Sequence, residues 1–348
     1  MNKEIRKLYI FNLATDLDNP LLAFTHDWIK ACLNEVSYIE VISTHVGRVD
    51  LPSQIRVREI GGGSFRKRIL GIFRLVRILK EIILNRNDSM VFFHMTNQFA
   101  AIIGLPIRVF KIPQGLWYSH SASPISFKLA ATFVNVVFSS SPNALPISNR
   151  KCKYVGHGIN FSKFPQVQNR QTSSGKTFVS LGRVSPIKNL ELFIEAVSKS
   201  SSKDKTVCLV GPDESNKDYK EQLIKLAEKL GVTLNFIGEV PYTEIPALLA
   251  NFSICYTGNP RTTDKAALEA AAVGCFVICS EPNTQELTGM NLVWEEIGEF
   301  PSTIKDQINS ILALENDFAF RKKISSWTKR QNDVNKTLSH VLSGIENA

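Results

Sequence analysis

Short apolar segments alternate with amphipathic segments through the C-terminal half of the chain. The apolar segments are 177–183, 206–211, 233–240, 253–258 and 275–280. Apolar residues at helical spacing mark the segments between them, which are 189–200, 218–231, 243–252 and 264–273. Strands that are apolar throughout and alternate with helices indicate a parallel sheet covered on both faces. The pattern therefore predicts a doubly wound α/β domain.

The N-terminal half repeats this alternation less regularly. Strands are predicted at 7–14, 37–44, 89–95, 109–120 and 134–140, and helices at 20–34, 65–85, 97–103 and 124–132. Residues 153–160 are a last strand and turn, and the polar stretch 161–176 is the predicted linker. The predicted divisions are an N-terminal domain (1–165), a C-terminal domain (166–316) and a helical tail (317–348) that packs back across their junction. Two such domains facing each other leave a central cleft at the carboxyl ends of their strands.

Length, cysteine usage and charge narrow the class of protein. The 348 residues suit two domains, and no apolar run approaches the roughly 18 residues that a membrane span needs. The basic N-terminus is followed by a short apolar run and then acids, which favours a first strand over a signal peptide. The six cysteines form no CxxC pair and are expected to be buried free thiols in a reducing compartment. The net charge of +9 suits an anionic partner.

The segment 261–281, RTTDKAALEAAAVGCFVICSE, places Lys265 and Glu269 one turn apart at the start of an alanine-rich helix. The three residues before the helix, 262–264, are all suitable N-caps. Free N–H groups and the helix dipole make such a helix start a phosphate site, to which Lys265 adds a charge. Glu269 could accept two hydrogen bonds from a ribose diol. The alternative is a solvated Lys–Glu pair worth about 0.2–0.5 kcal/mol.

A second candidate phosphate site lies in LGRVSPIKN (181–189), directly after a predicted strand. Arg183 offers a planar fork for two phosphate oxygens, and Lys188 offers a point charge. The alternative is a pair of solvated loop cations. Because the carboxyl ends of parallel strands share one edge of a sheet, both candidate loops are expected at the same edge. Two phosphate-ready loops at one edge favour a diphosphate site.

Three segments carry a resemblance to a known family. They are SLGRVSPIKNLELFIEA (180–196), IGEVPYTEIPALLANFSICY (237–256) and DKAALEAAAVGCFVICSE (264–281). In this order they resemble the donor half of retaining glycosyltransferases of the GT-B fold, of the family 4 type (glycosyl transferases group 1). The resemblance is strong over 175–290 and weaker in the N-terminal half. It implies two Rossmann-like doubly wound domains facing a central cleft, and a hexosyltransferase that uses a nucleoside-diphosphate sugar.

The resemblance implies a role for each donor-site residue. In such enzymes the Arg and Lys of a G-R-x-x-x-x-K pattern hold the donor diphosphate, which implies Arg183 and Lys188. The later glutamate binds the donor ribose, which implies Glu269. The loop after the IGEV strand lines the nucleobase, which implies Glu239 and Val240.

The sequence departs from the family pattern at one place. Many members carry a first glutamate eight residues before the ribose glutamate, and Arg261 stands there in this chain. The usual glycine-rich turn is replaced by NPRTTDK, so the helix start offers Thr263, Asp264 and Lys265. An Asp-Lys pair at this place resembles a subgroup of the family. Either Asp264 substitutes for the missing glutamate, or the donor sugar is an unusual one.

Two histidines of the N-terminal half are the catalytic candidates. His26 follows the first strand, where the family brings this domain near the donor phosphates. His120 ends LWYSH, where related enzymes have a histidine that touches the donor sugar or nearby backbone. The alternative for each is a hydrogen-bonded structural histidine. No Asp-x-Asp motif stands where a GT-A enzyme would hold a metal, so neither metal nor cofactor is expected. Cations and a helix start would neutralise the leaving diphosphate instead.

A basic helix is the remaining signal, in GGGSFRKRILGIFRLVRILKEIILNR (61–86). At 100° per residue its cations fall within an arc of about 140°, with apolar residues expected opposite. These cations are Arg66, Lys67, Arg74, Arg77 and Lys80. A basic amphipathic helix in the acceptor domain is typical of a membrane surface or lipid-phosphate contact. The alternative is an ordinary helix with a cationic solvent face.

The combined expectation is a glycosyltransferase that moves a sugar from a UDP- or GDP-sugar to a glycan or polyprenyl-linked acceptor, with retention, in surface polysaccharide biosynthesis. We expect it in the cytoplasm, either soluble or peripherally bound to the cytoplasmic face of the membrane. One alternative is a sugar-nucleotide epimerase or hydrolase of the same fold, and another is a non-catalytic binding module with a degraded donor site. Nucleic acid is not an expected partner, because the basic stretch lacks aromatic residues interleaved for base stacking.

Overall fold

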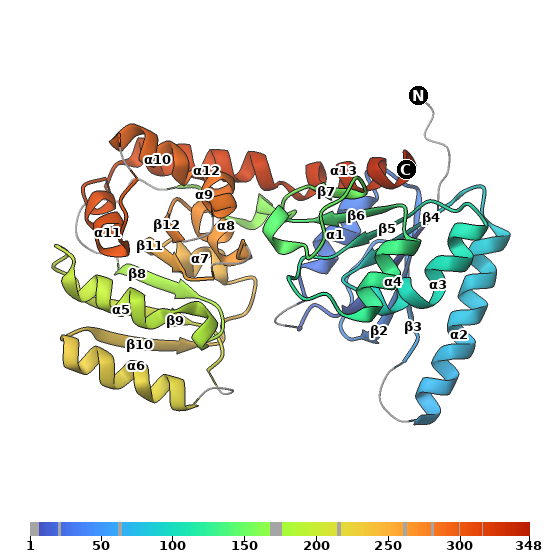
Figure 1. Cartoon of the computed structure of the whole chain (residues 1–348), viewed down its shortest axis with the longest axis horizontal. Helices are drawn as coiled ribbons and strands as arrows, with labels where there is room; N and C mark the ends of the chain where they lie inside the picture. The colour runs from blue at the N-terminus through green and yellow to red at the C-terminus, as the bar shows by residue number, and fades with distance from the viewer. Residues whose placement is uncertain are drawn as a thin grey trace. The chain divides into compact units, whose positions relative to one another are not determined.

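The computed structural model describes residues 7–19, 22–61, 65–167, 176–213, 217–259, 263–279, 282–298, 300–314 and 316–348; within these it leaves out the side chains of 65–69, 176–177, 217 and 282–283. The chain divides into two compact units (Figure 1). Unit 1 comprises Met1–Asn160 and Asp333–Ala348, and unit 2 comprises Phe161–Asn332. Each unit is built on its own parallel sheet.

Unit 1 contains a seven-stranded sheet of order β3-β2-β1-β4-β5-β6-β7. Its strands are β1 (Lys7–Thr15), β2 (Tyr38–Val46), β3 (Ile55–Glu59), β4 (Ser89–His94), β5 (Gln114–Trp117), β6 (Val136–Ser139) and β7 (Cys152–Tyr154). Every neighbouring pair is parallel, with Lys7 of β1 opposite both Tyr38 of β2 and Ser89 of β4. Buried apolar residues line both faces, as a parallel sheet requires.

Two layers of helices cover this sheet. One layer contains α1 (Thr25–Cys32) and α13 (Val334–Glu346), which share a core cluster with Leu8, Ile10 and Phe92. The other contains α2 (Phe65–Leu84), α3 (Asn97–Val109) and α4 (Ile125–Phe133), which share a core cluster with Tyr9, Phe11 and Phe93. Successive β1 residues thus point to opposite layers, which explains why both faces of the strand are apolar. A 3₁₀ turn, η1 (Pro142–Ala144), follows β6.

Unit 2 contains a five-stranded parallel sheet of order β10-β9-β8-β11-β12. Its strands are β8 (Lys176–Leu181), β9 (Thr206–Val210), β10 (Thr233–Gly238), β11 (Phe252–Thr257) and β12 (Phe276–Cys279). Its helices are η2 (Phe161–Lys163), η3 (Pro186–Lys188), α5 (Leu190–Lys199), α6 (Lys217–Leu230), α7 (Ile245–Leu249), α8 (Lys265–Ala272), α9 (Pro282–Thr288), α10 (Met290–Ile297), α11 (Ile304–Leu312) and α12 (Phe318–Asn332). The prediction of parallel sheets in two doubly wound halves is confirmed.

The elements differ from the prediction in three places. The strand predicted at 109–120 is wrong at its start, because α3 continues through Pro106 to Val109 and β5 begins only at Gln114. Apolar residues at 109 and 110 had suggested a strand, but Val109 is the last residue of the helix, in which Ile107 is buried in the core. The strand β3 was missed, since its sequence IRVRE alternates charged residues with only two apolar ones. Helices α9 to α11 were not predicted at all.

The C-terminal tail divides between the two units. The helix α12 belongs to unit 2, where Arg321 donates from Nε to the carbonyl of Gly274 at 2.9 Å and Ser325 donates to that of Ala272 at 2.6 Å. The helix α13 belongs to unit 1. At its start, the Val334 N–H donates to the Ile159 carbonyl at 3.1 Å. Among the described residues, no helix combines the length and apolar character needed to cross a membrane.

Candidate donor-binding site

The strand order of the sheet in unit 2 has a switch point between β8 and β11. From β8 the chain adds β9 and β10 on one side, and it then returns to add β11 and β12 on the other. In open α/β sheets, ligands bind beyond the carboxyl ends of the strands at such a switch point. The loops that follow β8 and β11 contain Lys188 and the pair Asp264–Lys265, so the sequence candidates lie where the fold rule places a ligand.

The backbones of these two loops are in direct contact at Gly258. A Cβ atom added to Gly258 would lie 2.0 Å from the carbonyl oxygen of Lys188, so only glycine allows the approach. Asn189 donates from Nδ2 to the Gly258 carbonyl at 3.0 Å, and the Tyr256 hydroxyl donates to the Asn189 carbonyl at 3.1 Å. Asn189 itself has a φ of 46°, in the left-handed region that asparagine tolerates better than most residues. These contacts set the position of Lys188 relative to β11.

Lys188 and Asp264 form an ion pair across the two loops. Lys188 Nζ lies 2.6 Å from Asp264 Oδ2, and the two side chains are only 17% and 15% exposed. Asn259 Nδ2 donates to the other oxygen of the same carboxylate at 3.4 Å. Because a largely buried charge is costly without its partner, the pair holds both side chains in place. The sequence predicted Lys188 and Asp264 as separate donor ligands and did not predict that they pair.

Lys265 and Glu269 form a second pair on the first turns of α8. Lys265 Nζ lies 3.3 Å from Glu269 Oε1 and donates to the Tyr242 hydroxyl at 2.9 Å. The same ammonium lies 4.2 Å from the centroid of the Tyr242 ring. The Glu269 side chain is 6% exposed, which does not fit the alternative of a solvated pair. Sequence reasoning missed Tyr242, although it stands in the loop after β10 that was assigned to the nucleobase.

The other donor-site predictions have simpler environments. Arg183 is exposed in the turn after β8, Glu239 is exposed after β10, and Val240 is half-buried. Thr263 is buried beside the start of α8, with 3% of its surface exposed. Arg261 lies outside the described residues, so the position of the missing family glutamate has no structural account.

The two candidate catalytic histidines lie in unit 1 in contrasting settings. His26 lies on α1 and is 2% exposed, and neither of its ring nitrogens has a hydrogen-bond partner among the described residues. Burial lowers the pKa of His26, so the ring is neutral at pH 7. His120 is exposed, and its Nδ1 accepts from the Ala122 N–H at 2.9 Å. The ring therefore closes a turn through Nδ1 and keeps Nε2 for another partner.

The arrangement predicted for the basic helix is wrong in one respect. Leu75, Ile78 and Ile82 of α2 do pack against the sheet, but Ile72, Phe73 and Val76 are 62%, 69% and 60% exposed. Apolar residues therefore stand on both sides of α2, because its apolar arc is wider than one core can cover. Of the predicted cations, Arg74, Arg77 and Lys80 are exposed, while the side chains of Arg66 and Lys67 lie outside the described ones.

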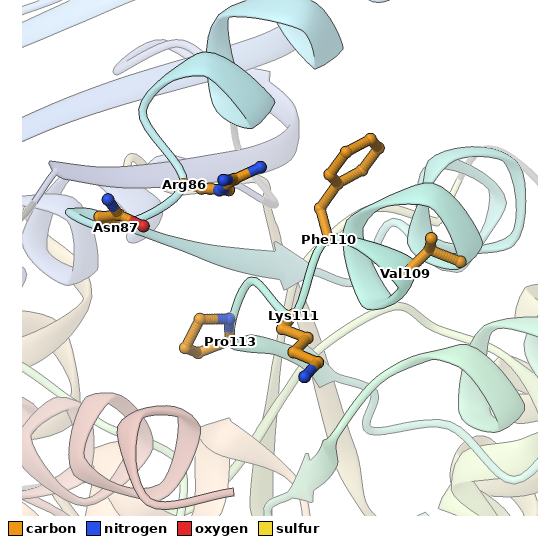
Figure 2. A pocket seen from close by; sticks show the side chains of 6 residues that line it. All are labelled: Arg86, Asn87, Val109, Phe110, Lys111 and Pro113. Carbon is orange, nitrogen blue, oxygen red and sulfur yellow. The ribbon is translucent and has the colours of Figure 1, made fainter.

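Two further observations concern ligands. In the described part of the chain, no three His, Cys, Asp or Glu side chains gather closely enough to hold a metal ion. A pocket of about 550 Å³ lies in unit 1, where the end of α3 meets the segment after α2 (Figure 2). Its lining comes from Arg86, Asn87, Val109, Phe110, Lys111 and Pro113. None of these residues had been predicted as part of a site.

Comparisons with known proteins found one family model and several solved structures of similar fold. Residues 163–335 match the family model described as glycosyl transferases group 1. The chain is similar in structure to Anabaena HepE solved with UDP-glucose, with a TM-score of 0.68, 14% identity, and coverage of 98% of this chain and 100% of that one. A Rickettsia africae glycosyltransferase gives a TM-score of 0.70 at 14% identity, covering 99% of this chain and 98% of that one.

The lipopolysaccharide outer core galactosyltransferase WaaB, in its apo form, gives a TM-score of 0.65 at 11% identity, covering 98% of this chain and 99% of that one. A search of curated protein sequences found no match. At these identities the structural likeness establishes the fold, and the family model covers the unit that holds the candidate site. The segment 163–335 thus carries the sequence pattern of the glycosyl transferases group 1 family, within a chain of GT-B fold.

Proposed function

We propose that the protein is a retaining glycosyltransferase that moves a sugar from a UDP- or GDP-sugar to a glycan or lipid-linked glycan, in surface polysaccharide biosynthesis. The observation that carries the proposal is the meeting of the Lys188 loop and the start of α8 at the switch point of unit 2. The family model over the same unit supports it. So does the fold shared with a protein crystallised with UDP-glucose.

In this proposal, different residues of the candidate site bind the diphosphate, the ribose and the nucleobase. Lys188 and Arg183 bind the diphosphate, together with the N–H groups at the start of α8. Glu269 accepts hydrogen bonds from the ribose hydroxyls, and Lys265 holds its carboxylate through the 3.3 Å contact. Glu239 and Val240 line the nucleobase. No metal or cofactor is proposed, because these cations and N–H groups can neutralise the leaving group.

The proposed reaction breaks the bond between the anomeric carbon and the diphosphate oxygen. The electron pair leaves with the diphosphate, whose growing charge Lys188 and Arg183 stabilise. The acceptor hydroxyl attacks from the face that the diphosphate leaves and gives its proton to the departing diphosphate oxygen. Attack from this face retains the anomeric configuration. His120, through its Nε2, and His26 remain the proposed catalytic contacts of unit 1.

Asp264 has a specific part in this scheme. Its carboxylate contacts Lys188 at 2.6 Å, so in this state it orients the ammonium that would bind the diphosphate. When the donor arrives, Lys188 exchanges this partner for a phosphate oxygen, and the freed carboxylate becomes available to a sugar hydroxyl. This would let Asp264 substitute for the family glutamate whose position Arg261 occupies.

The first experiment identifies the nucleotide and separates the candidate functions. A thermal-shift screen of UDP, GDP, ADP and CMP is expected to show stabilisation by UDP or GDP. With the matching sugar nucleotide, release of the nucleoside diphosphate should depend on an added glycan or polyprenyl-linked acceptor. Release without acceptor would indicate a hydrolase, interconversion of the sugar an epimerase, and binding without turnover a non-catalytic module.

Glu269→Ala tests the ribose assignment. The change should weaken binding of both the nucleoside diphosphate and the free nucleoside by about 1–3 kcal/mol, because both would lose the hydrogen bonds to the ribose. Lys265→Ala should weaken binding less, since it only positions Glu269. The matched control is Glu195→Ala on α5, which removes an exposed carboxylate paired with Lys199. Unchanged affinity in Glu269→Ala, measured by calorimetry, would show that the ribose lies elsewhere.

A polyprenyl-linked acceptor would bring the protein to the cytoplasmic face of the membrane. Localisation at that face is therefore part of the proposed function. Fractionation of cells that make the full chain, with and without a high-salt wash of the membranes, tests this part separately from catalysis.

A further inference from the structure

The outer side of the layer formed by α2, α3 and α4 exposes an unusual amount of apolar surface. These helices lie side by side over one face of the sheet of unit 1 (Figure 1). Of the 18 large apolar side chains that the described part of the chain leaves exposed, 11 lie on this layer or on the residue that ends α3. We call this outer side the α2–α4 surface. Ordinary monomer surfaces scatter such side chains singly, so their concentration on three neighbouring helices indicates an interaction site.

The α2 part of this surface mixes apolar side chains with cations. At 100° per residue, Val76, Lys80, Phe73 and Arg77 follow one another over an arc of about 100°. Phe73 is 69% exposed and Arg77 is 83% exposed, so both project into solvent. Arg74 is also exposed, although it donates to the Glu59 carbonyl at 3.1 Å. Charged and apolar groups thus occupy the same solvent-facing strip of the helix.

Acidic residues are nearly absent from this layer. The sequences of α2, α3 and α4 contain a single acid, Glu81. Its carboxylate contacts Arg58 at 2.6 Å and Arg77 at 3.4 Å, so its charge is already balanced. The pKa of Glu81 is lowered by its hydrogen bond to Arg58, which keeps the group ionised and paired. The layer therefore presents positive charge without a compensating free carboxylate.

The pocket of Figure 2 extends this surface at its edge. Val109 and Phe110, at the end of α3, are 68% and 40% exposed and line the pocket beside Arg86 and Lys111. In Figure 2, Arg86 comes from the segment after α2, and Val109, Phe110 and Lys111 come from the end of α3 and the segment after it. Two more cations thus stand next to exposed apolar groups, as they do on α2.

We propose that the α2–α4 surface docks onto an anionic phospholipid bilayer. Exposed apolar side chains such as Phe73 and Val76 would enter the boundary between headgroups and acyl chains, while Arg74, Arg77 and Lys80 contact lipid phosphates. A nucleic acid would use the cations and leave the aliphatic side chains in water, and an acidic protein groove would need charges matched to this strip. Only a bilayer offers a continuous apolar layer beneath a continuous layer of anions.

This inference deepens the membrane localisation that is part of the proposed function, and it does not rest on the donor site. Its charge pattern lies in unit 1, and its test needs no nucleotide. If the chain proved not to be a transferase, vesicle binding would still be expected. If the chain did not bind vesicles, the transferase assignment would still stand.

Vesicle co-sedimentation of the full chain tests the proposal. At low salt, the protein should bind vesicles of phosphatidylglycerol and phosphatidylcholine at least tenfold more tightly than vesicles of phosphatidylcholine alone. Arg74→Glu/Arg77→Glu/Lys80→Glu should lower this binding by more than a hundredfold. Each cation removed costs about fivefold in affinity, and replacing it with a negative charge costs more. The matched control is Lys199→Glu/Lys225→Glu/Lys229→Glu on α5 and α6, which makes the same charge change and should bind three- to tenfold less tightly at most.

The apolar part is tested by Phe73→Ser/Val76→Ser, which should weaken binding tenfold or more even where salt screens the cations. Leu192→Ser/Phe300→Ser, at two exposed apolar sites of unit 2, is its control and should leave binding unchanged. The fluorescence of Phe73→Trp should shift to the blue on vesicle binding. All of these sites are exposed, and an unchanged circular dichroism spectrum confirms that each variant folds.

Three outcomes would overturn the proposal. One is equal binding to anionic and neutral vesicles, and another is binding that survives both α2 variants. The third is retention by RNA or by an acidic protein resin, abolished by the triple variant, with no binding to vesicles.

Discussion

Lys188 and Glu269, two residues of the candidate donor site, form ion pairs with Asp264 and Lys265 respectively. At the residue scale, the groups predicted to bind the nucleotide therefore satisfy one another. Such pairing keeps four charged side chains in place at low cost, because each buried charge has a partner. It also means that a diphosphate must compete with Asp264 for Lys188, which favours a ligand of higher charge over a single phosphate.

Lys188→Ala should separate diphosphate binding from ribose binding. We expect affinity for the nucleoside diphosphate to fall by about 1.5–3 kcal/mol, because a charged hydrogen bond is lost, with little change for the free nucleoside. Calorimetric titration of both ligands measures this. Lys199→Ala on the neighbouring α5, whose side chain is 62% exposed, is the control. Equal losses for diphosphate and nucleoside would contradict the assignment of Lys188.

His94 leads to a prediction about how the stability of the fold depends on pH. It is fully buried at the end of β4, its Nδ1 lies 3.1 Å from Asn12 Oδ1, and burial lowers its pKa from 6.5 to about 4. The unfolded chain therefore binds a proton on this histidine between pH 6.5 and about 4, and the folded chain does not. Stability is unaffected above this window and should fall on acidification through it, by about 1.4 kcal/mol per pH unit.

Urea denaturation at several pH values checks this expectation. His94→Asn should reduce the loss of stability between pH 6.5 and 4, even if the variant is less stable at pH 7. His340→Asn changes an exposed histidine and should leave the slope as it is. An identical slope in His94→Asn would assign the acid sensitivity to another group, such as the buried His26.

At the element scale, the loops after β8 and β11 position the charged residues of the candidate donor site. The strands and helices around them follow from apolar periodicity, and the sequence predicted most of these elements. The same reasoning failed for β3, because an edge strand with alternating charges lacks the continuous apolar run of a buried strand. It also misplaced the end of α3, because a proline within a helix resembles a helix boundary in sequence.

Gly258→Ala should disrupt the contact between these loops. The added Cβ would lie 2.0 Å from the Lys188 carbonyl oxygen, so the backbone has to move and take Lys188 with it. We expect nucleotide affinity to fall by roughly tenfold or more as the charged hydrogen bond is lost. Gly231→Ala, at a φ of 67° with no atom near the new Cβ, should cost about 1–2 kcal/mol of stability and leave affinity unchanged. Equal nucleotide affinity in both variants would contradict the role of the loop contact.

At the scale of the whole molecule, the chain leaves unit 1 after Asn160 and returns to it at Asp333. The returning helix α13 buries Leu338, Val341 and Ile345 in the core of unit 1. Residues 333–348 therefore belong to the same unit as the N-terminal sheet, and unit 1 lacks this covering helix until they have been synthesised.

Leu338→Ala should destabilise unit 1 selectively, by about 2–5 kcal/mol for a fully buried leucine. Calorimetric unfolding should show one transition that moves to lower temperature. A second transition, belonging to unit 2, should still rise in temperature when the nucleotide is added. Leu192→Ala, at a half-exposed site on α5, is the control and should move neither transition by more than about 1–2 °C. A single transition that falls as a whole would show that the units unfold together.

The sequence by itself determined the fold class of this protein and predicted the residues that we propose for the donor site. Apolar periodicity depends on neighbours a few residues apart, and the cations at the strand ends could be read from the same short segments. Tertiary structure alone decided which charges pair, that Tyr242 joins Lys265, that α13 completes unit 1, and that Phe73 and Val76 face solvent. Those facts depend on segments far apart in the chain and on how much apolar surface one core can cover, and no local pattern contains either.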